Sequence, residues 1–425
     1  MQGVAKLKGW MQVVTTVALV TLLAACGGGG GSSSSSGSNN SGLPANPGAQ
    51  PVASSAGNTA PITVGQGVAN VINIPTVSVT VCAPGTTTCQ TINNVQVDTG
   101  SYGLRIVSGA LNSTMLNALV RAPAPYSSGN TLAECTTFAD GYSWGTVRNA
   151  TVQISSETAT NIPIQVLGDL PESSQPPSCI SGAEENTASS IGANGILGIG
   201  VAPYDCEANC ASATLAPTYS NYYACNGSSC VTTPTQVPDL DQVANPVARF
   251  ATDNNGVIVE MAPISYSGAG SATGTLVFGI NTATNNKLAA AQTFTTDAYG
   301  DLNSSTFNGS TVQAFFDSGS NAYFFADSSL PECGSSYSGF YCPSSGQTLS
   351  VNLVGLNGVT ATASVGILSA STLFSNGSNY AFNDLGGQIG MAATFDIGLP
   401  FFYGRYMYYG IDQTASGGQA PFVGY

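Results

Sequence analysis

The sequence predicts an all-β protein built from two similar halves. Charged residues make up only 7% of the 425 positions and glycine occurs 51 times, a balance that favours strands joined by tight turns over helices. Two short motifs, Val97–Ser101 and Phe316–Ser320, each place an aspartate at the end of an apolar run. Small hydroxyl residues and a glycine follow each aspartate, so the strand can turn sharply and leave the carboxylate exposed. Two copies of one motif suggest two matching halves.

The strands themselves are expected from residue 61 onward. In the first half, apolar alternation predicts strands over residues 77–82, 92–97, 146–154 and 162–166. A short apolar strand marked by glycines, Asn194–Gly200, follows about 100 residues after Asp98. The second half repeats this order, because Phe395–Phe402 is again apolar and marked by glycine.

Length and charge narrow the possible functions. The chain is long enough for roughly two domains of ordinary size after a leader and a linker are removed. It contains no histidine, which excludes a Ser-His-Asp triad, a Cys-His dyad, a histidine zinc site and a histidine general base. Two of the 8 basic residues lie in the leader, so 6 basic against 22 acidic residues give the remainder a formal charge of −16. Nucleic acid is therefore not an expected partner.

The N-terminus resembles a bacterial lipoprotein signal. Two lysines precede an apolar stretch over residues 11–23, and a Leu-Ala-Ala-Cys sequence then ends at Cys26. The apolar run is short for a membrane span, which favours a cleaved leader over residues 1–25. The resemblance implies that Cys26 is acylated and that the protein is anchored to the outer membrane, facing the periplasm or the exterior, because Gly27 follows the cysteine. The alternative is an ordinary secretory leader that happens to contain a cysteine.

Residues 26–60 are expected to form a flexible tether. Glycine, serine, asparagine, alanine and proline dominate this segment, and large apolar side chains are almost absent. Such a composition buries too little surface to fold. The tether would hold the folded part away from the bilayer.

Ten cysteines remain when Cys26 is set aside. An even number in an exported chain predicts five disulfides. Short loops between Cys82 and Cys89 and between Cys333 and Cys342 could close locally. The other expected pairings are within the group Cys206, Cys210, Cys225 and Cys230, which leaves Cys135 for Cys179. The group of four lacks paired Cys-x-x-Cys knuckles, so we expect disulfides there and no metal.

In the order of these landmarks, residues 61–425 resemble the pepsin-like aspartic peptidases. Thr137–Gly145 looks like the flap hairpin of that family, and Asn194–Gly200 looks like its glycine-marked strand. Gly274–Gly279 looks like the segment that closes the first lobe, and residues 396–412 look like the last strands. The resemblance implies a bilobal double β-barrel with pseudo-two-fold lobes over residues 61–270 and 271–425. It also implies one catalytic aspartate in each lobe, Asp98 and Asp317.

The chemistry expected of Asp98 and Asp317 is acid–base catalysis. Two carboxylates about 3 Å apart cannot both ionise freely, so they share a proton and can hold a water between them. The ionised partner accepts a proton from that water as it attacks a peptide carbonyl. The protonated partner stabilises the developing oxyanion and then serves the leaving nitrogen. This chemistry needs no metal, cofactor or covalent intermediate.

Six residues of the two motifs are expected to support the aspartates in like pairs: Gly100 with Gly319, Thr99 with Ser318, and Ser101 with Ser320. The two glycines let backbone amides approach the carboxylates. The resemblance implies that the second pair forms hydrogen bonds across the lobes. The serines of the third pair would bond the outer carboxylate oxygens and favour ionisation.

The flap departs from the family pattern. Phe138 stands where the family usually has a tyrosine, and Arg105 stands where it has the tryptophan that steadies that tyrosine. Tyr142 or Trp144, close to Gly141 in the expected hairpin, could supply a hydrogen bond to substrate instead. The alternative is that both rings simply pack in the hairpin.

Three functions compete for this sequence. The leading one is a lipid-anchored endopeptidase that cuts peptide or protein substrates, in acid, in a cleft between the lobes. The second is a catalytically silent lipoprotein of the same fold that binds peptide, protein or glycan at the cell envelope. The third, a glycosidase, needs carboxylates about 5 Å or more apart and leaves the duplicated motif unexplained. Asp396, where an apolar residue is expected, adds a third carboxylate to any of these.

Overall fold

The computed structural model describes residues 42–388, 390–391 and 393–425, and strands dominate these residues. The strands up to residue 261 are β1 (Thr59–Val64), β2 (Thr76–Cys82), β3 (Cys89–Asp98), β4 (Tyr102–Val107), β5 (Thr131–Thr137), β6 (Gly141–Ile154), β7 (Glu157–Leu167), β8 (Ala183–Glu184), β9 (Gly195–Ile199), β10 (Tyr222–Asn226), β11 (Ser229–Cys230) and β12 (Gly256–Met261). The later strands are β13 (Ala272–Phe278), β14 (Thr293–Thr295), β15 (Leu302–Phe307), β16 (Ser310–Asp317), β17 (Tyr323–Phe325), β18 (Gln347–Val354), β19 (Thr360–Ile367), β20 (Gly386–Gln388), β21 (Thr394–Gly398), β22 (Tyr406–Gly410) and β23 (Phe422–Gly424). The short α-helices are α1 (Ser113–Ala118), α2 (Ala188–Ile191), α3 (Ala208–Ala211), α4 (Ala216–Tyr219) and α5 (Ala370–Leu373). The all-β prediction is confirmed.

Six strands of the first half close into a barrel. Their order is β2, β3, β9, β4, β7 and β6, and β6 pairs back onto β2. Branched side chains such as Val79, Val97 and Leu104 are fully buried in its core, as suits residues that pack well on a pleated surface. All four strands predicted for this half lie within strands of the barrel.

The second half forms a seven-stranded sheet in the order β19, β18, β15, β16, β21, β17 and β20. Its centre repeats the centre of the barrel. In the first half β9 pairs parallel with β3 and antiparallel with β4, and in the second half β21 pairs parallel with β16 and antiparallel with β17. The two halves therefore share one local topology around the strand that ends in each aspartate.

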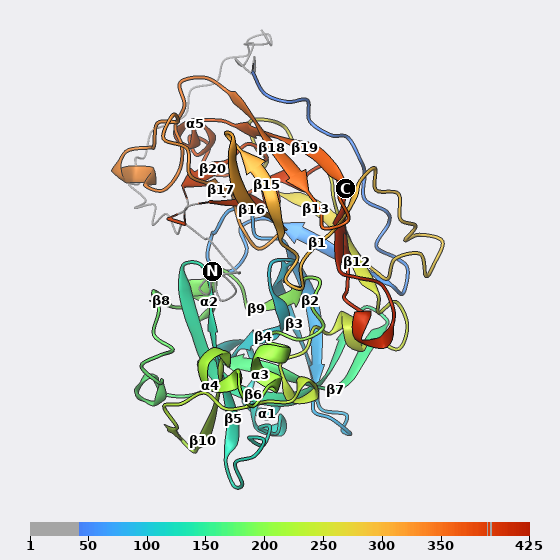
Figure 1. Ribbon diagram of the computed structural model, residues 1–425, viewed down its shortest axis with the longest axis vertical. Helices are drawn as coiled ribbons and strands as arrows, with labels where there is room; N and C mark the ends of the chain where they lie inside the picture. The colour runs from blue at the N-terminus through green and yellow to red at the C-terminus, as the bar shows by residue number, and fades with distance from the viewer. Residues whose placement is uncertain (1–41, 389, 392) are drawn as a thin grey trace, which may run out of the picture.

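Strands from both ends of the chain join the two halves. Beyond β2 the first sheet continues through β1, β13, β12, β22, β23 and β14, so the sheet that begins with the barrel also contains the last strands of the chain. Figure 1 shows the first half in the lower part of the view and the second half in the upper part, with β1, β12 and β13 near their junction. The prediction of two lobes is confirmed.

One part of the expected tether does not behave as a flexible segment. Residues 42–58 run along the second half without forming a strand (Figure 1). The Val52 amide donates to Glu260 Oε2 at 2.6 Å, and the Thr275 hydroxyl donates to the Val52 carbonyl at 2.6 Å. These bonds use backbone groups, which composition does not reveal, so the flexible-tether prediction is wrong for residues 42–60. Strand β1 then begins at Thr59.

The described residues contain five disulfides, and their pairing agrees with the sequence prediction. Three of them are Cys82–Cys89, Cys135–Cys179 and Cys333–Cys342. The group of four pairs internally, as Cys206–Cys210 and Cys225–Cys230.

The predicted leader over residues 1–25 and the predicted lipidation site at Cys26 lie outside the described residues. Among the residues that are described, no helix has both the length and the apolar character needed to cross a bilayer. The anchor therefore stays a prediction from the sequence.

Candidate active site

Asp98 ends β3 and Asp317 ends β16, and in each half a glycine of the partner strand lies directly beside the aspartate. Asp98 is in register with Gly198, and Asp317 is in register with Gly398. A Cβ on Gly198 would lie 2.6 Å from the Tyr102 amide nitrogen. A Cβ on Gly398 would lie 2.0 Å from the Ala322 carbonyl oxygen, in the loop that follows Asp317. The chain turns so closely over these strands that only glycine fits.

The two loops bring Asp98 and Asp317 together. The side-chain carboxyls form a hydrogen bond with each other. A Cβ on Gly100 would lie 2.6 Å from Asp317 Cγ, and a Cβ on Gly319 would lie 2.6 Å from Asp98 Oδ1. Each carboxyl therefore lies against the glycine of the opposite loop, where any larger residue would displace it.

Each carboxyl is also held by its own loop in the same way. The Gly100 amide donates to Asp98 Oδ1 at 2.9 Å, and the Ser101 hydroxyl donates to Asp98 Oδ2. In the second loop the Gly319 amide donates to Asp317 Oδ1 at 2.7 Å, and the Ser320 hydroxyl oxygen lies 3.0 Å from Asp317 Oδ2. The structure places these four supporting residues beside the aspartates, as the motif suggested.

Thr99 and Ser318 connect the two loops. The Ser318 amide donates to Thr99 Oγ1 at 2.8 Å, and the Thr99 amide donates to Ser318 Oγ at 3.2 Å. The Ser318 hydroxyl donates to the Val97 carbonyl at 2.7 Å, and the Thr99 hydroxyl donates to the Phe316 carbonyl at 3.4 Å. This reciprocal set of bonds fixes the position of one aspartate relative to the other.

Asp396 lies next to this pair, on β21, and is 4% exposed. The Ser320 hydroxyl oxygen lies 3.0 Å from Asp317 Oδ2 and 2.5 Å from Asp396 Oδ2. A hydroxyl carries one hydrogen, so it donates to one carboxyl and accepts from the other, which must then be protonated. The equivalent register position of the first half holds Ile196, so the two halves differ here. The sequence marked Asp396 as out of pattern but did not reveal this contact.

The electrostatics of the pair follow from burial. Asp98 and Asp317 are 0% and 1% exposed. Burial, the charges of Asp98 and Asp396, and the hydrogen bond with Asp98 raise the pKa of Asp317 well above its usual range. Asp317 therefore keeps its proton to a higher pH than an ordinary aspartate does.

The aromatic residues of the expected flap are packed within the chain. Strands β5 and β6 form the hairpin, and Phe138 at its tip is 1% exposed within an apolar cluster of the first lobe. The Trp144 indole donates to Ser174 Oγ at 3.0 Å, and the Tyr142 hydroxyl donates to Gln175 Oε1 at 2.9 Å. The packing alternative holds for both rings, because their polar atoms already have partners and are not free for a substrate.

A neighbouring segment covers the flap tip. Gly141 pairs with Ala183 of β8, and a Cβ on Gly141 would lie 2.4 Å from the Ala183 carbonyl oxygen. Asp140 hydrogen-bonds to Glu185 through the side chains, and burial together with the Asp140 charge raises the pKa of Glu185 to about 9. The flap is thus attached to β8 by backbone pairing and to the next residue, Glu185, by a hydrogen bond between carboxyls.

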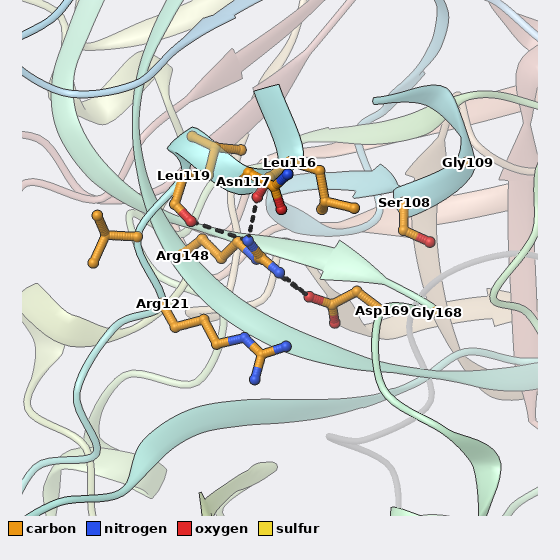
Figure 2. Close-up of a pocket in the computed structure, with 10 residues that line it drawn as sticks. Ser108, Gly109, Leu116, Asn117, Leu119, Arg121, Arg148, Gly168 and Asp169 are labelled. Atoms are coloured by element: carbon orange, nitrogen blue, oxygen red, sulfur yellow. Dashed lines mark hydrogen bonds and ion pairs between the residues drawn. The ribbon is translucent and has the colours of Figure 1, made fainter. Parts of the chain in front are cut away.

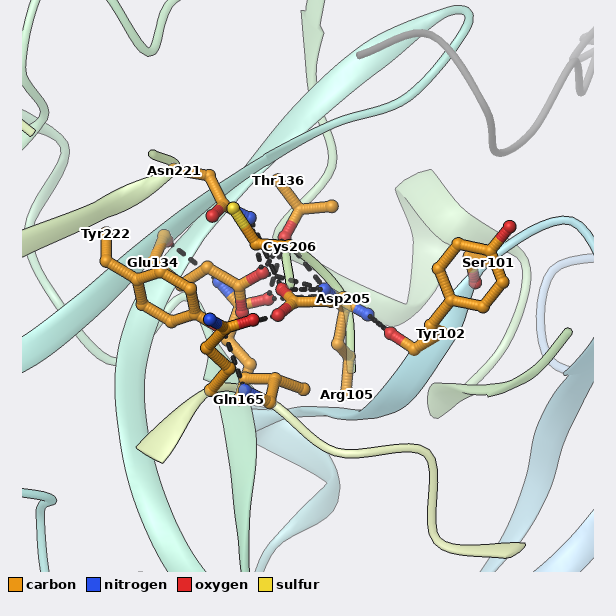
Figure 3. Close-up of polar contacts among 12 residues, drawn as sticks. Ser101, Tyr102, Arg105, Glu134, Thr136, Gln165, Asp205, Cys206, Asn221 and Tyr222 are labelled. Carbon is orange, nitrogen blue, oxygen red and sulfur yellow. Dashed lines mark hydrogen bonds and ion pairs between the residues drawn. The ribbon is translucent and has the colours of Figure 1, made fainter. Parts of the chain in front are cut away.

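Arg105 forms a buried polar cluster between the Asp98 loop and the flap (Figure 3). Its guanidinium forms ion pairs with Glu134 at 2.7 Å and Asp205 at 3.1 Å. It also donates to the Tyr102 carbonyl at 2.7 Å and to Thr136 Oγ1 at 3.1 Å. Glu134 and Thr136 belong to β5, so Arg105 ties the flap strand to β4. Arg105 stands where the family has a tryptophan, and its side chain joins the flap to β4 through these polar contacts.

The carboxyls of this cluster share a proton. Burial and the Glu134 charge raise the pKa of Asp205 well above its usual range. Sequence reasoning missed Glu134 and Asp205, although a basic residue inside an apolar strand signals that carboxylates must be buried beside it.

Fold and site together define a class: a two-lobed all-β protein with a pair of hydrogen-bonded aspartates at the junction of its lobes. The chain belongs to the family described as "Protein of unknown function (DUF3443)", whose model matches residues 54–425. No curated protein matches the sequence. Among solved structures it is similar to the aspartic proteinase from Irpex lacteus, with 17% identity and a TM-score of 0.46, over 86% of this chain and 96% of that one.

Proposed function

We propose that the protein is an aspartic-type endopeptidase. The observation that carries the proposal is the hydrogen-bonded pair of Asp98 and Asp317, braced by bonds between Thr99 and Ser318. Two carboxyls in contact, of which one keeps its proton, provide a base and an acid at the same place.

In the proposed reaction Asp98 is the base. It takes a proton from a water that attacks the peptide carbonyl carbon. Protonated Asp317 donates a hydrogen bond to the carbonyl oxygen as negative charge develops there. The proton then passes to the leaving nitrogen, the C–N bond breaks, and an acid and an amine result. The amides of Gly100 and Gly319 keep both carboxyls oriented throughout.

A second candidate is a catalytically silent protein of the same fold that binds peptide, protein or glycan. Two observations favour it. Both aspartates are buried, so a substrate reaches them only if their cover opens, and the flap aromatics are packed rather than free.

Peptide cleavage separates the two candidates. The mature protein, with its N-terminus intact and kept in detergent, is incubated with a mixed peptide library between about pH 3 and 7. The proposal expects cleavage that Asp98→Asn and Asp317→Asn each abolish and that Asp241→Asn, a change at an exposed carboxylate, leaves intact. Cleavage that survives either of the first two changes contradicts the mechanism. A folded protein that cleaves nothing at any of these pH values supports the silent candidate.

We also propose attachment to the outer membrane through a lipid on Cys26, which the sequence around that residue supports. Cells grown with labelled fatty acid are expected to label the wild-type protein and not Cys26→Ser. The label should fractionate with the outer membrane. An unlabelled wild-type protein would contradict the anchor.

A further inference from the structure

A second candidate site lies on the first lobe, away from the two aspartate loops. It is an open cavity of about 670 Å³ between the end of β4, helix α1 with the residues after it, and the end of β7 (Figure 2). Small-molecule sites are commonly of this size. None of the residues that line the cavity belongs to the aspartate motifs, so a ligand could bind here whether or not the protein is a peptidase.

Two arginines line this cavity in a chain that has few basic residues. Arg148 is fully used, because it pairs with Asp169 at 2.6 Å and donates to the Leu116 and Leu119 carbonyls at 2.6 and 3.0 Å. Asp169 is satisfied as well, since Thr146 also donates to it through its amide. The Arg148–Asp169 pair therefore contributes no net charge to the cavity.

Arg121 supplies the charge that remains. It is half-buried, and within the described part of the chain its guanidinium makes no hydrogen bond or ion pair. Figure 2 shows it reaching toward the Arg148–Asp169 pair. Two guanidiniums beside one carboxylate leave one positive charge, although the whole chain is strongly acidic. An anion placed here would pair with the planar donors of Arg121.

The rest of the lining indicates the kind of anion. Leu116, Leu119 and Val120 provide an apolar wall, and Val120 is 68% exposed. Asn117 and Ser108 add neutral polar groups. One free guanidinium suits a single negative charge better than a doubly charged phosphate, and the apolar wall suits a hydrocarbon body.

We propose that this cavity binds a small monocarboxylate, with its carboxylate on Arg121 and its apolar part on Leu116, Leu119 and Val120. The two halves of the site then match the two parts of the ligand. The Arg148–Asp169 pair holds the apolar residues in place, because Arg148 donates to the Leu116 and Leu119 carbonyls.

The probe for this proposal is N-acetyl-leucine, and its control is N-acetyl-leucinamide, which has the same body without the charge. Binding to the full mature protein is measured by calorimetry at pH 7. We expect the acid to bind at least tenfold more tightly than the amide. We expect Arg121→Gln to weaken binding of the acid at least tenfold, and Arg249→Gln, at an exposed arginine that donates to the Tyr204 hydroxyl, to leave it unchanged.

A second variant guards against misfolding of the first. Val120→Asp changes an exposed residue, so the fold is retained, and its negative charge should repel the acid and not the amide. Equal binding of acid and amide would overturn the proposal, because the site would then be merely apolar. Undetectable binding of the acid, or binding that Arg121→Gln and Val120→Asp both leave unchanged, would overturn it too.

Discussion

Replacing Ser318 with alanine is expected to destabilise the protein strongly, because this hydroxyl joins the two aspartate loops. Ser318 is fully buried, donates to the Val97 carbonyl at 2.7 Å and accepts from the Thr99 amide at 3.2 Å. Alanine leaves that carbonyl and that amide buried without a partner, at about 1–3 kcal/mol each. The expected loss of about 2–6 kcal/mol is a large share of the roughly 5–15 kcal/mol that stabilises a typical domain.

Chemical denaturation measures this loss in both lobes. Trp144 is the only tryptophan after the leader and lies in the first lobe, so its fluorescence follows that lobe, while circular dichroism follows the strands of both. The midpoint should fall by both probes in Ser318→Ala. Ser78→Ala, at an exposed serine bonded to Asn93, is the control and should change stability by less than about 0.5 kcal/mol.

A double-mutant cycle with Thr99→Val tests whether the two loops support each other. Each residue bonds to the backbone of the other, so the double variant should lose less than the sum of the single losses, with a coupling of about 0.5–3 kcal/mol. Losses that add within about 0.3 kcal/mol would show that the loops are independent. That result would refute the argument that Thr99 and Ser318 fix the aspartates relative to each other.

Three further changes test other parts of the site. Asp396→Asn removes a charge that raises the pKa of Asp317, so Asp317 should lose its proton at lower pH and the basic limb of the peptidase pH profile should move to lower pH. Gly398→Ala puts a Cβ 2.0 Å from a carbonyl oxygen, which should cost about 3 kcal/mol or more in denaturation. The pKa of Glu185 near 9 lies far above its ordinary 4.5, so wild-type stability should fall as pH rises from about 4.5 to 9. Glu185→Gln should remove this fall in melting temperature, since glutamine does not ionise.

Each of these three predictions would be contradicted by a specific result. An unmoved basic limb in Asp396→Asn would separate that residue from the pair. Gly109→Ala, at a glycine with open space around its Cβ position, is the control for Gly398→Ala, and equal losses would contradict the close turn over β21. A wild-type melting temperature that is flat between pH 5 and 9 would show that Glu185 is not buried as a protonated acid.

The sequence revealed the fold and the aspartate loops because their signals are local. Each motif combines an apolar run, an aspartate and a glycine within five residues, and the glycines of β9 and β21 are required by the turns above them. The disulfide pairs were equally accessible, since four of the five join cysteines fewer than ten residues apart. Short-range pattern therefore carried most of what was predicted correctly.

The parts that were not predicted depend on distant partners. Arg105 pairs with Glu134 and Asp205, which lie 29 and 100 residues away, and no spacing rule connects such positions. Residues 42–58 have the composition of a linker and are held by bonds to their backbone. The packed rings of Tyr142 and Trp144 were likewise undecided until their partners were known.

The carboxyls of Asp98, Asp317 and Asp396 at the lobe junction influence one another's protonation. The bond between Asp98 and Asp317 needs one proton, and the single hydrogen of the Ser320 hydroxyl can be donated to only one of Asp317 and Asp396. The charge of Asp396 raises the pKa of Asp317, and a pair that holds one proton is the state that the proposed peptide hydrolysis requires. With Ile196 in the first half and Asp396 in the second, only the second half adds a third carboxyl beside the pair. In the proposed reaction this asymmetry favours Asp317 as the acid and Asp98 as the base.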